Sequence, residues 1–358
     1  GNLYLLDEED LEVSSSSSTN SPRSPLLLHT TDHKFAYYPS LSADGTRVIY
    51  IQWSDIDLGQ VMSLDLETGE REELSVSSGH YINPLLSPDD QWLIYQRVSG
   101  GWITSPRRSH RRGLYALHLE TGEEYLLDER GRAAHFGPEA DRIYFTVRDE
   151  KKKTLYSQSI PHGHQWKRAE SESVQGMKVS PDGEWLAFQA DFNVYLTLAP
   201  SSARPLKIGP KERGLPLLQL SASSGFDLQW APDSGSLYWS LGATLYRHEL
   251  PKEWIKDPPE LKTESPKKDP SKEGSESPSS DSSSKTDTSK GITRSEEAQV
   301  IEIQLSVDTA HPRGSIALIG PRVITMRQEE VIEEGFILVE EDRITQVGPL
   351  SEWRHRIP

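Results

Sequence analysis

The residues of this sequence that could do chemistry are few, and the clearest of them form the motif His162-Gly163-His164. A His-X-His pair after an apolar strand can ligate a divalent metal ion, which would activate water for hydrolysis. When the repeats described below are aligned, however, the motif falls on Thr121-Gly122-Glu123, the tip of a hairpin. We therefore interpret it as a turn whose two histidines could at most collect stray metal at the surface.

A basic run, Arg107-Arg108-Ser109-His110-Arg111-Arg112, stands out in a chain whose formal net charge is −16. Its arginines could contact an anion or a protein partner at the rim of the fold, because each guanidinium offers bidentate donors. The plainer interpretation, which we favour, is a solvated loop before the strand that opens at Leu114. The acidic balance of the whole chain argues against a nucleic-acid surface, which needs clustered Lys and Arg.

The other polar and aromatic residues that recur are better explained by structure than by chemistry. The acidic residues lie at turns rather than as a carboxylate pair, and the tryptophans beside them are expected to pack between sheets rather than to line a ligand surface. These are Asp44, Asp89, Asp182 and Asp233, and Trp92, Trp185 and Trp230. There is no cysteine, no nucleophile elbow, no Walker loop and no dinucleotide fingerprint. We predict no catalytic, cofactor-binding or metal-binding residue in this chain.

The elements that carry these residues repeat along the chain. A Ser-Pro-Asp-Gly-type turn precedes a β-branched or aromatic run five times, with its acidic residue at Asp44, Asp89, Glu139, Asp182 and Asp233, spaced by 45, 50, 43 and 51 residues. Proline presets φ for the turn, aspartate caps it, and glycine accepts a positive φ. A period of this size is typical of a four-stranded propeller blade.

A second element of each repeat is a Leu-Tyr-like pair that opens a further strand. It occurs at Leu3-Tyr4, Val61-Met62, Leu114-Tyr115, Leu155-Tyr156, Val194-Tyr195 and Leu245-Tyr246. Six copies of this strand against five turns predict a first blade cut by the start of the sequence. The expected fold is therefore all-β, a β-propeller of about six four-stranded blades followed by a short β-sandwich segment.

Composition divides the chain further. We expect propeller blades over residues 1–256, and a disordered Ser/Lys/Pro/Glu-rich linker or blade insertion over 257–297, because that stretch has too few apolar residues to offset its ordering entropy. The run from Ala298 to Leu305 predicts the return strand of the last blade, within residues 298–312. Short alternating strands over 313–358 predict a separate small sheet.

The turn repeats resemble those of TolB-like and tricorn-type propellers over about residues 1–250. Because TolB-like propellers are often exported, the resemblance implies a periplasmic or extracellular protein. No apolar run approaches the roughly 18–20 residues needed to span a bilayer. The sequence opens on Gly1 without an initiator Met, so we expect it to start inside a longer gene product, with any signal peptide out of view.

The last segment resembles the entry to the metal-dependent amidohydrolase superfamily, in particular its imidazolonepropionase-related members. The strand Val323-Ile324-Thr325-Met326 and the later Val347-Gly348 follow the family pattern. Two features depart from it: Pro321 replaces the usual small residue, and Glu341-Asp342-Arg343 stands in for the glycine-containing turn before Ile344. The resemblance implies half of a β-sandwich beside a catalytic barrel in the same protein. It also implies zinc or another divalent metal, held beyond Pro358.

Three functions follow from these features. The first is the N-terminal part of a metal-dependent hydrolase that acts on non-peptide or small-amide C–N bonds. This part would be inactive by itself, and its partner would be the barrel of the same protein. The propeller could also contact other proteins or form a homo-oligomer. The second is a non-catalytic TolB-like module for protein–protein interaction. The third is a propeller-gated serine peptidase of the prolyl oligopeptidase type, disfavoured because residues 315–348 do not head towards an α/β-hydrolase sheet.

Overall fold

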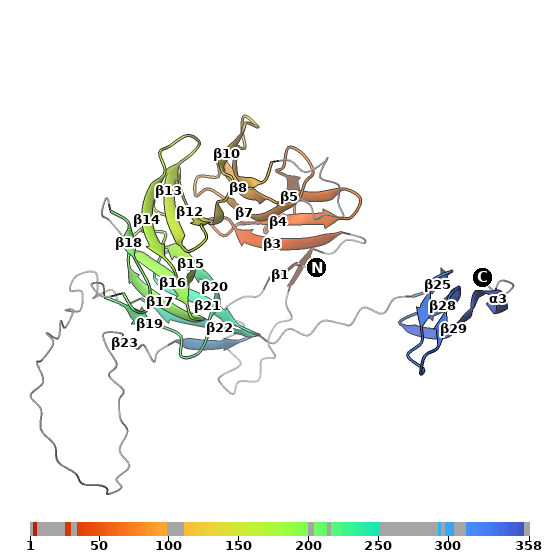
Figure 1. The fold of residues 1–358 in the computed structure, drawn as a ribbon. Helices are drawn as coiled ribbons and strands as arrows, with labels where there is room; N and C mark the ends of the chain where they lie inside the picture. Colours follow the sequence, from red (N-terminus) through yellow and green to blue (C-terminus); the bar gives the residue numbers. More distant parts are fainter. Residues whose placement is uncertain are drawn as a thin grey trace, which may run out of the picture. The chain divides into compact units, whose positions relative to one another are not determined.

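The computed structural model describes residues 3–5, 26–29, 34–98, 111–199, 204–212, 216–250, 293–294, 298–303 and 313–353. The chain divides into two compact units, Gly1–Ile303 and Gln304–Pro358, which we call the propeller unit and the C-terminal unit (Figure 1). None of the helices in these ranges has the length and apolar character needed to cross a membrane.

The described part of the propeller unit contains five sheets built on one plan, each with four antiparallel strands, and we number them blades 1 to 5. Their strands are β3 (Phe35–Leu41), β4 (Arg47–Ser54), β5 (Leu58–Asp65) and β6 (Arg71–Glu73) in blade 1; β7 (Tyr81–Leu86), β8 (Trp92–Arg97), β9 (Gly113–His118) and β10 (Glu124–Asp128) in blade 2; β11 (Arg132–Phe136), β12 (Arg142–Arg148), β13 (Lys153–Ser159) and β14 (Trp166–Ser171) in blade 3; β15 (Val174–Val179), β16 (Trp185–Ala190), β17 (Asn193–Leu198) and β19 (Leu218–Gln219) in blade 4; and β20 (Phe226–Trp230), β21 (Ser236–Leu241), β22 (Thr244–Glu249) and β24 (Gln299–Glu302) in blade 5. A two-stranded sheet, the half-blade, joins β1 (Leu3–Leu5) to β2 (Leu26–His29). This is the predicted all-β propeller architecture (Figure 1).

The Ser-Pro-Asp-Gly turns join the first and second strands of the blades through local hydrogen bonds. In blade 4 the Ser180 hydroxyl donates to the Asp182 carboxylate and accepts the backbone N–H of Trp185 at 3.0 Å. The Gly183 N–H closes the turn onto the Ser180 carbonyl at 2.9 Å, and Gly183 has a φ of +77°. Blade 2 forms the same turn with Asp90, whose φ is +57°, at the glycine position.

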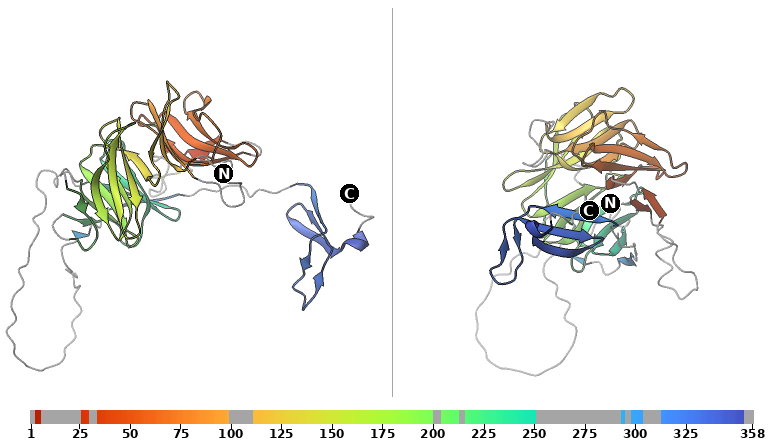
Figure 2. Two further views of the ribbon diagram at one scale, coloured as in Figure 1. Left: turned by 45° about the horizontal axis from the view of Figure 1, so that its top comes forward. Right: turned by 90° about the vertical axis from the view of Figure 1, so that its right-hand side faces the viewer.

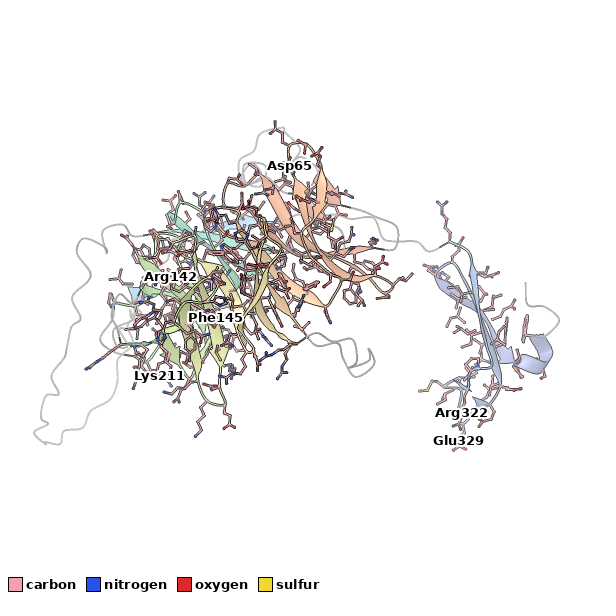
Figure 3. All side chains as sticks on the ribbon, turned by 90° about the horizontal axis from the view of Figure 1, so that it is seen from above. Asp65, Arg142, Phe145, Lys211, Arg322 and Glu329 are labelled. Atoms are coloured by element: carbon pink, nitrogen blue, oxygen red, sulfur yellow. The ribbon has the colours of Figure 1, made fainter. Side chains whose placement is uncertain are left out.

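The Leu-Tyr pair has a structural role that the register explains. The tyrosine of the third strand lies opposite a fully buried aromatic residue of the second strand, and the two rings stack. These pairs are Tyr95 with Tyr115, Phe145 with Tyr156, Phe188 with Tyr195, and Trp239 with Tyr246. Figure 3 shows Phe145 within the body of the propeller unit, whereas Asp65 and Lys211 lie at its periphery. Blades 2 to 5 are therefore each held by an internal aromatic pair as well as by their neighbours, whereas blade 1 has Met62 opposite Tyr50.

Two blades are wider than expected. The strand β18 (Leu206–Lys207) pairs in parallel with β14 of blade 3, and β23 (Thr293–Arg294) pairs in parallel with β19 of blade 4. Both come from the connection between the third and fourth strands of the following blade. They cover outer edges that would otherwise expose unpaired backbone groups.

The predicted domain limits fall partly outside the described ranges. The disordered linker or blade insertion expected over 257–297 lies outside them except for Thr293–Arg294, which pairs with β19 as β23. At the other side of that linker, β24 pairs with β22 as the outer strand of blade 5. The two units divide after Ile303, and residues 304–312 lie outside the described ranges.

The C-terminal unit is a small antiparallel sheet with a short helix. Its strands β25 (Ser315–Ile319), β28 (Gly335–Glu340) and β29 (Arg343–Pro349) pair in the order β25-β28-β29. A separate hairpin joins β26 (Val323–Ile324) to β27 (Val331–Ile332), and α3 (Leu350–Trp353) follows β29 directly (Figure 2). The helix was not expected from the sequence; it packs Leu350 and Trp353 against Phe336 and Leu338.

Candidate functional site on the inner strands of the propeller

The first strand of each blade carries a β-bulge. In four blades the bulge holds a residue that is not glycine at a φ between +50° and +54°. These residues are Tyr38, Asn83, Ala133 and Asp227. In blade 4 the register instead shifts at Gln175, between Val174 and Gly176. A bulge bends the strand and re-aims a side chain, and bulges are frequent beside binding sites.

The bulges place side chains in solvent on the inner strands. First strands of consecutive blades lie side by side, from β3 through β7, β11 and β15 to β20. In Figure 1, β3, β7, β15 and β20 lie on the side of their sheets that faces the middle of the propeller unit. The exposed side chains at the bulges are Tyr38, Asn83, Ala133, Gln175 and Asp227. The inner strands thus carry one exposed aromatic ring, two exposed amides and one exposed carboxylate at their bulges.

Neighbouring inner strands are joined by the residue two positions before the turn. In blade 1 the Ser40 hydroxyl donates to the Pro84 carbonyl of blade 2 at 2.7 Å. In blade 3 the Nε2 of His135 accepts the backbone N–H of Val179, in blade 4, at 2.9 Å. The Lys178 ammonium of blade 4 donates to the Gln229 amide oxygen of blade 5 at 2.9 Å. In blades 1, 3 and 4 this position therefore connects one blade to the next, whereas blade 2 has Leu85 there.

His135 is neutral in its site. Its ring is buried and stacks on Tyr144, and burial, helped by the positive charge of Lys178, lowers its pKa to about 3. Because Nε2 accepts a hydrogen bond, Nδ1 carries the proton and points to the Ala133 carbonyl at 3.2 Å. The histidine thus acts as a fixed acceptor between two blades.

Lys178, on the inner strand of blade 4, also has a perturbed pKa. Burial lowers its pKa to about 8, and the Asp227 carboxylate opposes that shift. The Ser240 hydroxyl donates to the same Asp227 carboxylate at 3.0 Å. A lysine and a carboxylate on adjacent inner strands can bind a polar ligand that carries both donors and acceptors.

The sequence-predicted candidates lie away from this side. His162-Gly163-His164 forms part of the turn between β13 and β14, as predicted, with His162 edge-on to Tyr125 and His164 edge-on to Trp166. Within the described ranges no three His, Asp or Glu side chains are grouped so that they could hold a metal ion.

The basic run is only partly described. Residues 107–110 lie outside the described ranges. Arg111 is exposed and pairs with Glu129, and its carbonyl accepts the Tyr115 hydroxyl at 2.6 Å. The loop interpretation therefore holds for Arg111, which has an ion-pair partner close to its own blade.

The recurring aspartates and tryptophans have the structural roles that were predicted for them. Asp44 accepts the hydroxyls of Ser42 and Thr46 in its own turn, which lowers its pKa to about 2. Trp185 is fully buried, and the Trp230 indole donates to the Lys178 carbonyl of the preceding blade at 3.2 Å. Trp92 packs edge-on against His118.

Sequence reasoning missed His135, Lys178 and the bulges. None of the four positive-φ positions is a glycine, so no local signal marks them. The alignment on the turn could have found the joining position, because Ser40, His135, Lys178 and Gln229 all lie two residues before it. Polar residues at that place in an otherwise apolar strand were the available signal.

No family model matches the sequence, and no curated protein matches it. Similar solved structures include TolB from Acinetobacter baumannii, 15% identical over 69% of this chain with a TM-score of 0.49, of which this chain spans 57% of the length. They also include a putative TolB from Agrobacterium tumefaciens, 14% identical over 63% of this chain and 80% of that one, with a TM-score of 0.45. An oligogalacturonate lyase in complex with manganese is 12% identical over 64% of this chain and 69% of that one, also at 0.45. At TM-scores below 0.5 these likenesses carry no argument about function, and none of them tests the resemblance of residues 315–348 to amidohydrolases.

Proposed function

We propose that this chain is the propeller-bearing N-terminal part of an amidohydrolase-related hydrolase that acts on C–N bonds of non-peptide or small amides. The proposal takes the resemblance of residues 315–348 together with one observation on the C-terminal unit. One face of its sheet is apolar and bare, which is what half of a β-sandwich looks like without its other half.

The bare face consists of two cross-strand rows. In the first row Ile316 of β25 lies opposite Val339 of β28, which lies opposite Ile344 of β29. In the second, Leu318, Ile337 and Val347 are aligned in the same way. Ile316 is 63% exposed and Ile344 is 65% exposed. We call these six side chains the apolar face.

The opposite face of the same sheet is covered. Phe336 and Leu338 are buried, and the Phe336 ring stacks on Trp353 of α3 at a centroid distance of 5.3 Å. A sheet with one finished face and one bare apolar face costs free energy in water, by roughly 25 cal/mol per Å² of apolar surface left exposed. The apolar face is therefore suited to a second sheet.

Among the described residues, no set of side chains fits the metal that the resemblance implies. Across the described ranges His, Asp and Glu form no group of ligands, and His162 and His164 lie at a hairpin tip against aromatic rings. The proposal therefore assigns no step of a reaction to the described residues. In the proposal, the C-terminal unit joins the propeller to a barrel that would hold the metal and activate water.

The test compares residues 1–358 with a longer product of the same gene that continues past Pro358. We expect chelator-sensitive hydrolysis of small or cyclic amides, restored by Zn²⁺, in the longer product alone. Ile316→Asp with Leu318→Asp should remove that activity and leave blade stability unchanged, whereas Glu340→Gln, on an exposed side chain of the same sheet, should have no effect. A longer product without metal-dependent amidase activity would exclude the proposal, and so would chelator-sensitive turnover by residues 1–358 alone.

A second candidate, a non-catalytic module for protein–protein interaction, is favoured by the inner strands. There Tyr38, Asn83 and Asp227 are exposed on bulges, and the Asp227 carboxylate acts on the Lys178 ammonium. If this candidate is right, a partner captured by the chain should be released by Asp227→Asn with Tyr38→Ala, and substitutions on the apolar face should leave capture intact. Capture that survives the inner-strand substitutions would count against it.

A further inference from the structure

The inner strands offer an internal comparison at two positions. The residues three and one before the turn point to the same side of the first strand, because one residue separates them. In blade 4 these residues are Met177 and Val179, which pack against Leu155 of blade 3. In blade 5 the residue three before the turn is Leu228, which packs against Trp185 and other residues of blade 4. These two positions therefore face the preceding blade.

Burial at these positions depends on a preceding inner strand. Met177 is 1% exposed, Val179 2% and Leu86 6%, and Pro84 is also buried. The equivalent residues Ala134, Phe136 and Trp230 are half-buried. Blade 1 is different at both positions. Leu41 is 58% exposed, and Pro39 is exposed as well. The same residue type, leucine, is thus covered in blade 2 and bare in blade 1.

The sheet on that side of blade 1 is the half-blade. Leu3 of β1 and Leu28 of β2 pack against Val48, Tyr50 and Leu64 of blade 1, so the outer part of the interface is formed. β1 contains the Leu-Tyr pair that marks the third strand of other blades. The two strands of the half-blade, β1 and β2, therefore correspond to the third and fourth strands of a blade. Among the described residues no strand holds the first and second positions of this sheet.

The way blades join defines what would fit. The preceding blade supplies alternating apolar residues from its second strand, such as Ile49 and Ile51 against blade 2. It also supplies a polar link from its first strand, such as the Ser40 hydroxyl on the Pro84 carbonyl. An occupant of the bare positions must therefore be a pair of strands with both features.

We propose that Pro39 and Leu41 form an acceptor surface for a β-hairpin that completes the half-blade to four strands. Its second strand pairs with β1 and presents alternating apolar side chains to blade 1, and its first strand covers Pro39 and Leu41. The partner is a hairpin with the pattern of this chain's own first and second strands, rather than a second folded copy of the chain. The surface continues the interface that Leu3 and Leu28 already make.

The natural chain contains no cysteine, so single cysteines report on this surface. Leu41→Cys is compared with Leu86→Cys, the covered equivalent, and with Val76→Cys, whose side chain is 68% exposed in the wild-type chain. We expect Leu41→Cys to react with a thiol reagent nearly as fast as Val76→Cys. Leu86→Cys should react at least about tenfold more slowly than either of them. The probe is a synthetic peptide of residues 81–97, which comprise β7, its turn and β8.

The peptide should slow labelling of Leu41→Cys about tenfold and leave Val76→Cys unchanged. A hairpin of the same sequence, fused ahead of residue 1, should give the same protection without added peptide. The proposal is overturned if neither form protects Leu41→Cys, or if a scrambled peptide protects it equally. Protection that grows with the concentration of the chain alone would also overturn it, because the occupant would then be a second copy.

Discussion

The blades of the propeller unit and the sheet of the C-terminal unit are made of the same antiparallel strands, yet they bury their apolar residues to very different extents. Phe145 in blade 3 is fully buried because blade 2 packs over it, whereas Leu318 in β25 is 48% exposed. A blade is covered by the copy that precedes or follows it, and the lone sheet has no copy. The difference shows that apolar residues of the propeller unit are buried because the repeated blades pack on one another, and not because their strands differ in composition.

The largest test of this comparison truncates one apolar residue in each unit. Phe145→Ala should lower the free energy of unfolding by about 3–5 kcal/mol, because it empties a packed site and removes the ring stacked on Tyr156. Leu318→Ala should change it by less than about 0.5 kcal/mol, since its side chain is already in water. Urea unfolding followed by tryptophan fluorescence measures the first, and hydrogen exchange of β25 and β28 measures the second. Equal losses at the two sites would break the comparison.

What the sequence predicts well is local. The turn around Asp182 and Gly183 follows from residue type alone, because its hydrogen bonds close within six residues, Ser180 to Trp185. The Leu-Tyr pair was found as a pattern, but its partner in the ring stack depends on register. The strands β18 and β23 were not predicted, because each pairs with a strand of another blade across a long connection. The candidate site is harder to predict, because the role of His135 depends on the hydrogen bond that it accepts from the Val179 N–H of the next blade.

The second prediction is that acid lowers the stability of the propeller unit before it affects the C-terminal unit. The folded-state pKa of His135 is about 3, whereas an unfolded histidine titrates near its ordinary value of about 6.5. The unfolded state therefore binds more protons below pH 6.5, so the stability that neutral His135 provides is complete above that pH and declines towards pH 3. The free energy of unfolding should fall by up to about 2 kcal/mol between pH 6.5 and 5. Urea unfolding at half-unit pH steps measures the slope.

The control is His135→Gln, which keeps an acceptor for the Val179 N–H but does not titrate. The groups that face the ring are Lys178 and Tyr144, and neither has an ordinary pKa in this window. Residues 313–353 contain no histidine, so the protection factors of the C-terminal unit, which are exchange rates corrected for the intrinsic effect of pH, should not change over the same range. An unchanged slope in His135→Gln would assign the acid sensitivity to another group.

The third prediction compares turns in the two units. Ser180→Ala removes the hydroxyl that accepts the Trp185 N–H and donates to Asp182, and it leaves a buried N–H without its partner. We expect a loss of about 1–2 kcal/mol in the free energy of unfolding. Asp342→Ala, in the exposed hairpin turn between β28 and β29, should cost less than about 0.5 kcal/mol. A large loss at Asp342 would show that the C-terminal unit depends on its turn more than its exposure suggests.

The smallest prediction separates backbone strain from burial. Ala133 has a φ of +51° and an exposed side chain, so Ala133→Gly relieves the clash of Cβ in a left-handed conformation without removing packing. It should stabilise the propeller unit by about 0.5 kcal/mol, after the extra freedom that glycine gains in the unfolded chain is subtracted. Ala134→Gly, one residue on and without a positive φ, should instead destabilise it by about 0.5–1 kcal/mol. In the C-terminal unit Glu341 has a φ of +56°, and Glu341→Gly should give the same gain as Ala133→Gly, because this term depends on the local backbone alone. Thermal unfolding of the three variants shows whether each substitution raises or lowers stability. Changes of opposite sign at Ala133 and Glu341 would mean that the two units differ in more than the burial of their apolar residues.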